Sequence, residues 1–210
     1  MLTTILKSSF IFLSVLGSII NISAKFKKIS YDIGQIGQSL ITISLASYFF
    51  LRGSLLIGFS FLLYSFADVF MDLGKWFFTL IGVLLFFTGH ILFIVNLIPT
   101  FEINSANVTT AVILILYILC LYFLTYHKPD IRKFLALLAY GSSLCILTII
   151  SPNIIMKIGF FIFLISDSFI GYLWLVEKAK RKLTGFQIDI LLQITYGLAL
   201  ITITGGFYEN

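Results

Sequence analysis

Long apolar runs separated by short polar connections make up most of the chain. A helix of about 20 residues, rising about 1.5 Å per residue, crosses the roughly 30 Å hydrocarbon core of a bilayer. The runs lack the period-two alternation of a membrane β-strand, so they indicate helices. The pattern therefore predicts transmembrane helices over residues 4–22, 33–51, 53–71, 77–97, 108–126, 132–150, 153–176 and 186–204.

The connections between the runs contain all three prolines, Pro99, Pro129 and Pro152. Proline lacks an N–H and clashes with the preceding turn, so it is tolerated best outside helix interiors. The predicted fold is all-α: one integral membrane domain over residues 1–210, built as a bundle of eight helices. A signal peptide over residues 8–22 fits less well, because the same apolar pattern recurs along the whole chain.

Composition excludes a soluble domain. Hydrophobic residues make up 60% of the chain and charged residues 11%, with a mean hydropathy of +1.08, whereas about 25% of the residues in soluble domains are charged. The two cysteines, Cys120 and Cys145, form neither a CxxC motif nor a metal-ligand spacing with histidine. We interpret both as core residues, and we expect no metal and no cofactor.

The basic residues are distributed unevenly between the two sides of the predicted bundle. Eleven of the 14 lie in or beside the connections after the first, third, fifth and seventh runs, and three lie on the other side. The positive-inside rule then predicts that the N- and C-termini face away from the cytoplasm. The loops are too short for a separate nucleic-acid-binding surface. We expect an inner membrane or another plasma membrane.

Asp68, His90 and Asp167 each lie well inside an apolar run. Burying an aspartate at mid-helix costs roughly 2.5 to 3.5 kcal/mol on insertion scales, so such a residue indicates function by default. Helical spacing places Tyr64, Asp68 and Asp72 on one stripe of the third run. The three ionisable groups therefore predict one buried polar site, with the two aspartates from separate helices sharing a pocket.

Other polar residues have a simpler interpretation beside the functional one. Asp72 and Asp189 lie near the ends of their runs, where they are placed to face lipid headgroups or loop lysines. Tyr64 and Tyr196 fit as buried aromatic residues with hydrogen-bonded hydroxyls, or as supporting members of the site. His90 alone fits a hydrogen-bonded core histidine as well as a catalytic group.

Four short motifs occur in order along the third, fourth, seventh and eighth runs: Ser65-x-x-Asp68, Gly89-His90-x-x-Phe93, Ser166-Asp167 and Thr195-Tyr196. Together with eight predicted spans and short loops, this order resembles the YhhN-like lysoplasmalogenase family. The chain differs from the family pattern in having Ala67 before Asp68, where the family usually has glycine, and Phe93 where the family usually has tyrosine. A Lys-Pro pair that opens the family's second span is absent, and the nearest polar residues are Lys28, Gln35 and Gln38.

The resemblance implies a membrane hydrolase that cuts the vinyl ether bond of a lysoplasmalogen to give a fatty aldehyde and glycerophosphoethanolamine or glycerophosphocholine. The chemistry needs one acid and one anion, and two carboxylates in a low dielectric supply both by sharing a proton. Asp68 and Asp167 are the expected pair, with His90 relaying a proton or orienting a carboxylate or water. The expected supporting residues are Tyr64, Ser65, Asp72, Ser166, Tyr196, Lys28 and Gln35.

Other functions share some of these features. A proton-coupled transporter of small molecules or lipids also needs intramembrane carboxylates and a histidine, although no predicted span contains the proline typical of a broken transporter helix. An intramembrane aspartyl protease also pairs two aspartates, but its Tyr-Asp and Gly-x-Gly-Asp signatures do not occur at Asp68 or Asp167. A purely structural membrane protein would leave the buried charges unexplained. The expected partners are a lysophospholipid substrate and the surrounding membrane lipids, and the sequence leaves the oligomeric state open.

Overall fold

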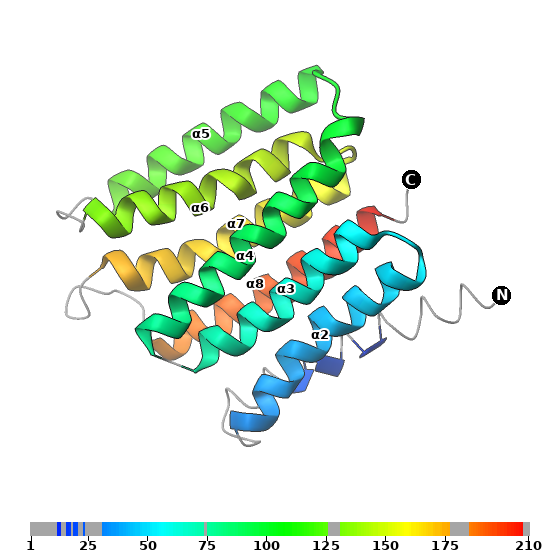
Figure 1. Cartoon of the computed structure of the whole chain (residues 1–210). Helices are drawn as coiled ribbons and strands as arrows, with labels where there is room; N and C mark the ends of the chain where they lie inside the picture. Colours follow the sequence, from blue (N-terminus) through cyan, green and yellow to red (C-terminus); the bar gives the residue numbers. More distant parts are fainter. Residues whose placement is uncertain are drawn as a thin grey trace. The chain divides into compact units, whose positions relative to one another are not determined.

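The computed structural model describes residues 12–13, 16–17, 19–20, 23, 31–73, 75–125, 131–176 and 185–207. The long elements in these ranges are all helical, with no strand among them (Figure 1). They are α2 (Tyr31–Leu51), α3 (Leu55–Asp72), α4 (Trp76–Leu97), α5 (Ser105–Thr125), α6 (Ile131–Ile150), α7 (Ile154–Leu175) and α8 (Gly185–Gly206). A short 3-10 helix, η1 (Ile98–Thr100), follows α4 and contains Pro99.

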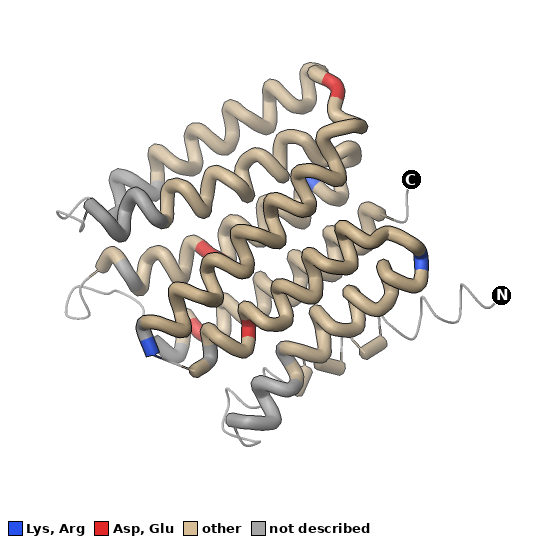
Figure 2. The backbone as a smooth tube through the Cα atoms, in the orientation of Figure 1, with Lys and Arg blue, Asp and Glu red and all other residues tan. Residues whose placement is uncertain are grey.

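The predicted spans from the second to the eighth each coincide with one of these helices. Within the described ranges, three stretches are long and apolar enough to cross a membrane: Phe77–Thr100, Ile154–Leu173 and Gln187–Gly206. The other helices contain shorter apolar stretches, and few of their described residues are charged (Figure 2). Most of the predicted first span, 4–22, lies outside the described residues. The count of eight spans, and the side of the membrane on which the termini lie, therefore stay predictions.

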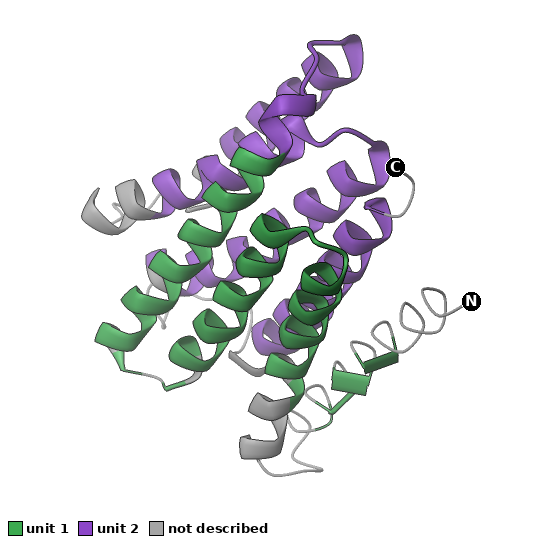
Figure 3. Ribbon diagram, turned by 45° about the vertical axis from the view of Figure 1, so that its right-hand side comes forward, with its two compact units in different colours: residues 1–96 green, residues 97–210 purple. Residues whose placement is uncertain are grey.

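Contacts divide the chain into two compact units, residues 1–96 and residues 97–210 (Figure 3). In the first unit α2 packs along α3, and in the second α6 packs on α7 and α7 on α8.

A tight turn joins α2 to α3 in the first unit. Gly53 adopts a φ of +76° there, in the left-handed region that glycine occupies at little cost. The turn is closed by two backbone hydrogen bonds, from Gly53 N to Phe50 O at 3.0 Å and from Ser54 N to Phe49 O at 2.9 Å. Beyond the turn, the Phe49 and Phe61 rings stack with their centroids 5.5 Å apart, which fixes how α2 lies on α3.

Asn153 joins the start of α7 to the end of α8 in the second unit. Its side-chain oxygen accepts a hydrogen bond from Met156 N at 2.9 Å, and its side-chain nitrogen donates to Gly206 O at 2.8 Å. A few residues further along α7, a Cβ at Gly159 would lie 2.7 Å from Ile203 N. Glycine at that position therefore permits a close approach of the two helix backbones, as small residues do in membrane helix pairs.

Lys157 is buried in the first turns of α7, although a lysine is rarely buried unless its charge is paired. Its Nζ donates to Asn107 Oδ1 at 2.6 Å and to Ile149 O at 2.7 Å. The second acceptor belongs to the last turn of α6, where unsatisfied carbonyls and the helix dipole favour a cation. The lysine thus links α5, α6 and α7 at one end of the unit.

The two cysteines differ in burial. Cys145 is buried in α6 as predicted, whereas Cys120 is exposed on α5, so the prediction that both are core residues is wrong for Cys120. A thiol is small and nearly apolar, and for that reason an apolar run tolerates it on an outward-facing position as well as in the core.

Candidate functional site

The first unit places four candidate residues on α3 and α4. Tyr64, Ser65 and Asp68 of α3 and His90 of α4 are buried, and Asp68 exposes 2% of its surface. The Tyr64 and His90 rings meet edge to face, with their centroids 5.5 Å apart. Asp68 follows Tyr64 by one helical turn, so the carboxyl and the phenol belong to the same stretch of α3.

Gly89 explains how the Tyr64 ring packs beside His90. A Cβ at position 89 would lie 2.5 Å from Cε1 and 2.9 Å from Cδ1 of Tyr64. Both distances are shorter than a van der Waals contact between carbon atoms. The ring is further held between Phe86 and Phe93, whose centroids lie 5.1 and 5.9 Å away. Gly89 therefore leaves a flat helix surface on which the Tyr64 ring packs, and His90 lies beside the same ring.

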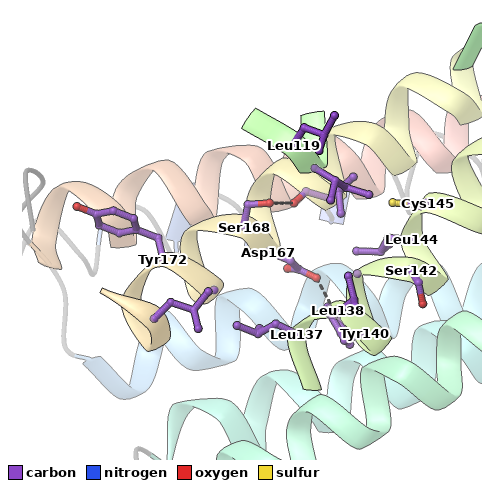
Figure 4. Close-up of a pocket in the computed structure, with 15 residues that line it drawn as sticks. Leu119, Leu137, Leu138, Tyr140, Ser142, Leu144, Cys145, Asp167, Ser168 and Tyr172 are labelled. Atoms are coloured by element: carbon purple, nitrogen blue, oxygen red, sulfur yellow. Dashed lines mark hydrogen bonds between the residues drawn. The ribbon is translucent and has the colours of Figure 1, made fainter. Parts of the chain in front are cut away.

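The second unit contains a pocket of about 510 Å³ between α5, α6 and α7 (Figure 4). Volumes of roughly 300 to 1,000 Å³ are typical of sites for small organic ligands. Most of its lining is leucine, isoleucine and glycine, while Asp167, Ser168 and Tyr172 contribute polar groups from α7 and Tyr140 and Ser142 contribute them from α6. An apolar pocket with a few polar groups suits an amphipathic ligand.

Asp167 is fixed at the pocket wall by a hydroxyl from the neighbouring helix. The Tyr140 hydroxyl donates a hydrogen bond to the Asp167 carboxylate, and both side chains line the pocket (Figure 4). A carboxyl group in apolar surroundings is costly unless donors satisfy it. The hydrogen bond therefore both stabilises the buried group and orients it.

The residues on either side of Asp167 make interhelical hydrogen bonds of their own. Ser166 Oγ donates to Leu192 O of α8 at 3.2 Å, and Ser168 Oγ accepts from the Tyr117 hydroxyl of α5 at 2.8 Å. Successive residues of a helix point about 100° apart, so three consecutive side chains contact three different helices. Bonds to α8 and α5 therefore fix the part of α7 that presents Asp167 to the pocket.

Tyr196 lies on the face of α8 that packs against α7. It is buried, and its ring meets the Phe163 ring edge to face with centroids 5.4 Å apart. Ser166 contacts α8 on the same side, whereas Asp167 contacts α6. The structure thus places Ser166 and Tyr196 behind the Asp167 segment rather than on the pocket wall.

Three predicted site residues fall outside what the structure describes. Lys28 lies outside the described residues. Gln35 and Asp72 belong to helices α2 and α3, but their side chains are not among those that the structure describes. Within the described ranges, no group of three or more histidine, cysteine, aspartate or glutamate side chains is arranged to hold a metal ion.

Tyr140 and Tyr117 were not among the residues predicted for the site. Both interrupt apolar runs in the same way as Tyr64 and Tyr196, and a hydroxyl in such a run needs a partner. That signal marks each of them as a hydrogen-bonding residue, but it does not identify the partner, because Tyr140 is separated from Asp167 by 27 positions and Tyr117 from Ser168 by 51.

Comparison with known proteins gives one match. The sequence model of the YhhN family matches residues 37–207, a range that includes Asp68, His90, Asp167 and Tyr196 and excludes Lys28 and Gln35. Neither the curated proteins nor the solved structures give a match.

Proposed function

The chain belongs to the YhhN family, and from this premise we propose that it is a membrane hydrolase acting on the vinyl ether bond of lysoplasmalogens. The products would be a fatty aldehyde and glycerophosphoethanolamine or glycerophosphocholine. The observation that carries the proposal is the Asp167 carboxyl group, held by Tyr140 on the wall of a pocket that is otherwise mostly apolar. Such a pocket suits a hydrocarbon chain with a reactive polar bond at its end.

A vinyl ether is nucleophilic at its β-carbon, so the difficult step is protonation of that carbon. A carboxylic acid donates the proton and leaves an oxocarbenium ion, which a nearby carboxylate stabilises. Water then adds to the cation and gives up a proton to the carboxylate, forming a hemiacetal. The hemiacetal breaks down to the aldehyde and the alcohol, so one water molecule is consumed overall.

The proposal assigns the acid and the anion to Asp68 and Asp167. Two carboxyl groups that share a site do not ionise together readily, so one proton is held between them. His90 orients a carboxylate or a water molecule, with the Tyr64 ring beside it and Ser65 next to Tyr64 on α3. Tyr140 supports Asp167 in the second. This pairing of the aspartates remains part of the proposal.

The deciding experiment offers the purified protein three single-chain substrates with the same headgroup. One has a vinyl ether bond, one an alkyl ether bond and one an ester bond, and free aldehyde is measured. We expect aldehyde from the vinyl ether alone, because only that bond is activated by carbon protonation. Absence of aldehyde, combined with uptake driven by a pH gradient in proteoliposomes, would instead favour a proton-coupled transporter.

A further inference from the structure

The pocket of the second unit is elongated along α7. Its α7 lining begins at Leu164 and ends at Leu175, eleven positions apart, which corresponds to about 16 Å along a helix. Asp167 lies one turn from the Leu164 end. The Asp167 and Ser168 side chains therefore lie toward one end of the α7 lining. Gly171, Tyr172 and Leu175 continue the lining toward the other end, where the Tyr172 hydroxyl is a further polar group.

Gly141 keeps the pocket open next to Asp167. It follows Tyr140 on α6 and lines the pocket, and a Cβ built at this position meets no atom within 4 Å. By contrast, a Cβ at Gly171 on the facing part of α7 would lie 3.6 Å from the Leu137 side chain. The free volume beside Asp167 thus depends on the missing side chain at position 141.

We propose that this pocket binds the hydrocarbon chain of a single-chain lipid, with its ether-bearing end at Asp167, and that Gly141 is the residue that admits the chain. A volume of about 510 Å³ and a mostly apolar lining that holds one carboxyl group suit one chain with one functional group, whereas a diacyl lipid brings two chains. The identity of the lipid as a lysoplasmalogen rests on the proposed function. The binding of a hydrocarbon chain in this pocket does not depend on the proposed function.

The test uses a probe that the enzyme cannot cleave: an alkyl-ether lysophosphocholine carrying a diazirine on its chain. After photolysis, we expect labels on pocket residues such as Leu119, Leu144 and Leu164. Unlabelled single-chain lipid should compete for this labelling, and diacyl phosphatidylcholine should not. Labels spread over exposed positions outside the pocket, such as Val112 and Ile158, without competition, would overturn the proposal.

Substitution at position 141 makes the test specific. A leucine side chain at position 141 would occupy part of the volume that the lipid chain needs, so Gly141→Leu should lower competed labelling by about fivefold to a hundredfold, which corresponds to about 1 to 3 kcal/mol. Gly141→Ala should lower it less. Gly205→Ala is the matched control, because a Cβ there meets only Ile155 at 3.8 Å and Gly205 does not line the pocket. Undiminished labelling of folded Gly141→Leu protein would contradict the proposal.

The two native cysteines provide a readout that needs no activity. Cys145 lines the pocket, while Cys120 is exposed on α5 and does not line it. The alkyl-ether lipid should slow modification of Cys145 by a small thiol reagent and leave the rate at Cys120 unchanged, and this protection should disappear in Gly141→Leu. A melting temperature in detergent close to that of the unsubstituted protein shows that the variant is folded, and equal protection of both thiols counts against the pocket.

The two hypotheses can fail separately. If the probe labels the pocket and protects Cys145 but no aldehyde is released from a lysoplasmalogen, the proposed function is wrong and the chain-binding site stands. If aldehyde is released while the labels lie elsewhere, the chain-binding site is wrong and the proposed function stands.

Discussion

At the scale of single residues, the Asp167 carboxyl shows how an ionisable group is kept inside an apolar bundle. Its neighbours Ser166 and Ser168 bond to other helices, and Tyr140 supplies the donor for the carboxyl itself. A hydrogen bond to a charged group is shorter and stronger than one between neutral groups. The Tyr140 hydroxyl therefore lowers the free-energy cost of burying Asp167 and holds its carboxyl group in one direction at the pocket wall.

Replacing Tyr140 by phenylalanine removes the donor and keeps the ring. Hydrogen bonds to charged groups contribute about 1.5 to 3 kcal/mol, so kcat/KM for aldehyde release should fall by about tenfold to a hundredfold. Tyr48→Phe is the matched control, since it removes a hydroxyl that accepts from Arg52 at 3.1 Å and Tyr48 is not one of the residues that line the pocket. An unchanged kcat/KM in Tyr140→Phe would show that the hydroxyl has no influence on Asp167 during the reaction.

Sequence reasoning could find Asp68, His90 and Asp167 because a charged or imidazole group inside an apolar run is rare and expensive. It could not find the role of Tyr140, because tyrosine is common in membrane helices and its hydroxyl finds many kinds of partner. The sequence could not predict the pocket either. Its walls are mostly leucine, isoleucine and glycine, which look the same in a sequence whether they enclose a cavity or fill one.

At the scale of elements, helix limits were predictable and helix pairing was not. The predicted span 77–97 differs by one residue from α4, Trp76–Leu97, and the predicted 132–150 differs by one from α6, Ile131–Ile150. Charged residues and prolines mark these limits in the sequence. Pairing depends instead on where small residues permit close contact, and a glycine in an apolar run does not reveal which helix it faces.

Gly89 on α4 is the position where pairing can be tested most directly. A Cβ there would overlap the Tyr64 ring at 2.5 Å, so Gly89→Ala should push the ring away from α4. Overpacking typically costs about 1 to 3 kcal/mol, and the melting temperature in detergent should fall accordingly. The double variant Gly89→Ala with Tyr64→Leu should recover most of the loss.

Gly205→Ala again provides the control for that measurement, since alanine there meets only an ordinary contact of 3.8 Å. Two results would contradict the packing described for α3 and α4. One is a Gly89→Ala melting temperature equal to that of Gly205→Ala, and the other is a double variant no more stable than the single one.

At the scale of the whole molecule, the charge asymmetry predicts which loops face the cytoplasm. The connection that contains Lys75 should be cytoplasmic and the one that contains Ile103 should face away. Both positions are exposed, Ile103 at 83%. In a background without Cys120 and Cys145, Ile103→Cys should react with a membrane-impermeant thiol reagent on intact cells, and Lys75→Cys should react only after permeabilisation. The reverse pattern would overturn the predicted orientation.

The proposed reaction also requires residues from both units to act together, and kinetics can test this requirement. Asp68→Asn and Asp167→Asn each keep the side-chain shape and remove the ability to donate or hold a proton. General acid–base catalysis contributes about 10²- to 10⁴-fold, so each variant should lose a factor of that size in kcat/KM. Asp189→Asn, in the half-buried first turns of α8, should stay close to the unsubstituted rate.

The double variant Asp68→Asn with Asp167→Asn separates a shared proton from two independent roles. Groups that act as one unit lose their combined contribution when either is removed, so the second substitution should add little to the first. Two independent contributions would instead multiply, and the double variant would fall by the product of the two single losses. Each protein should be shown to insert and to remain monodisperse, so that a loss of folding is not counted as a loss of chemistry. A multiplicative result would leave the two aspartates without a common site and would remove the acid and anion pair from the mechanism.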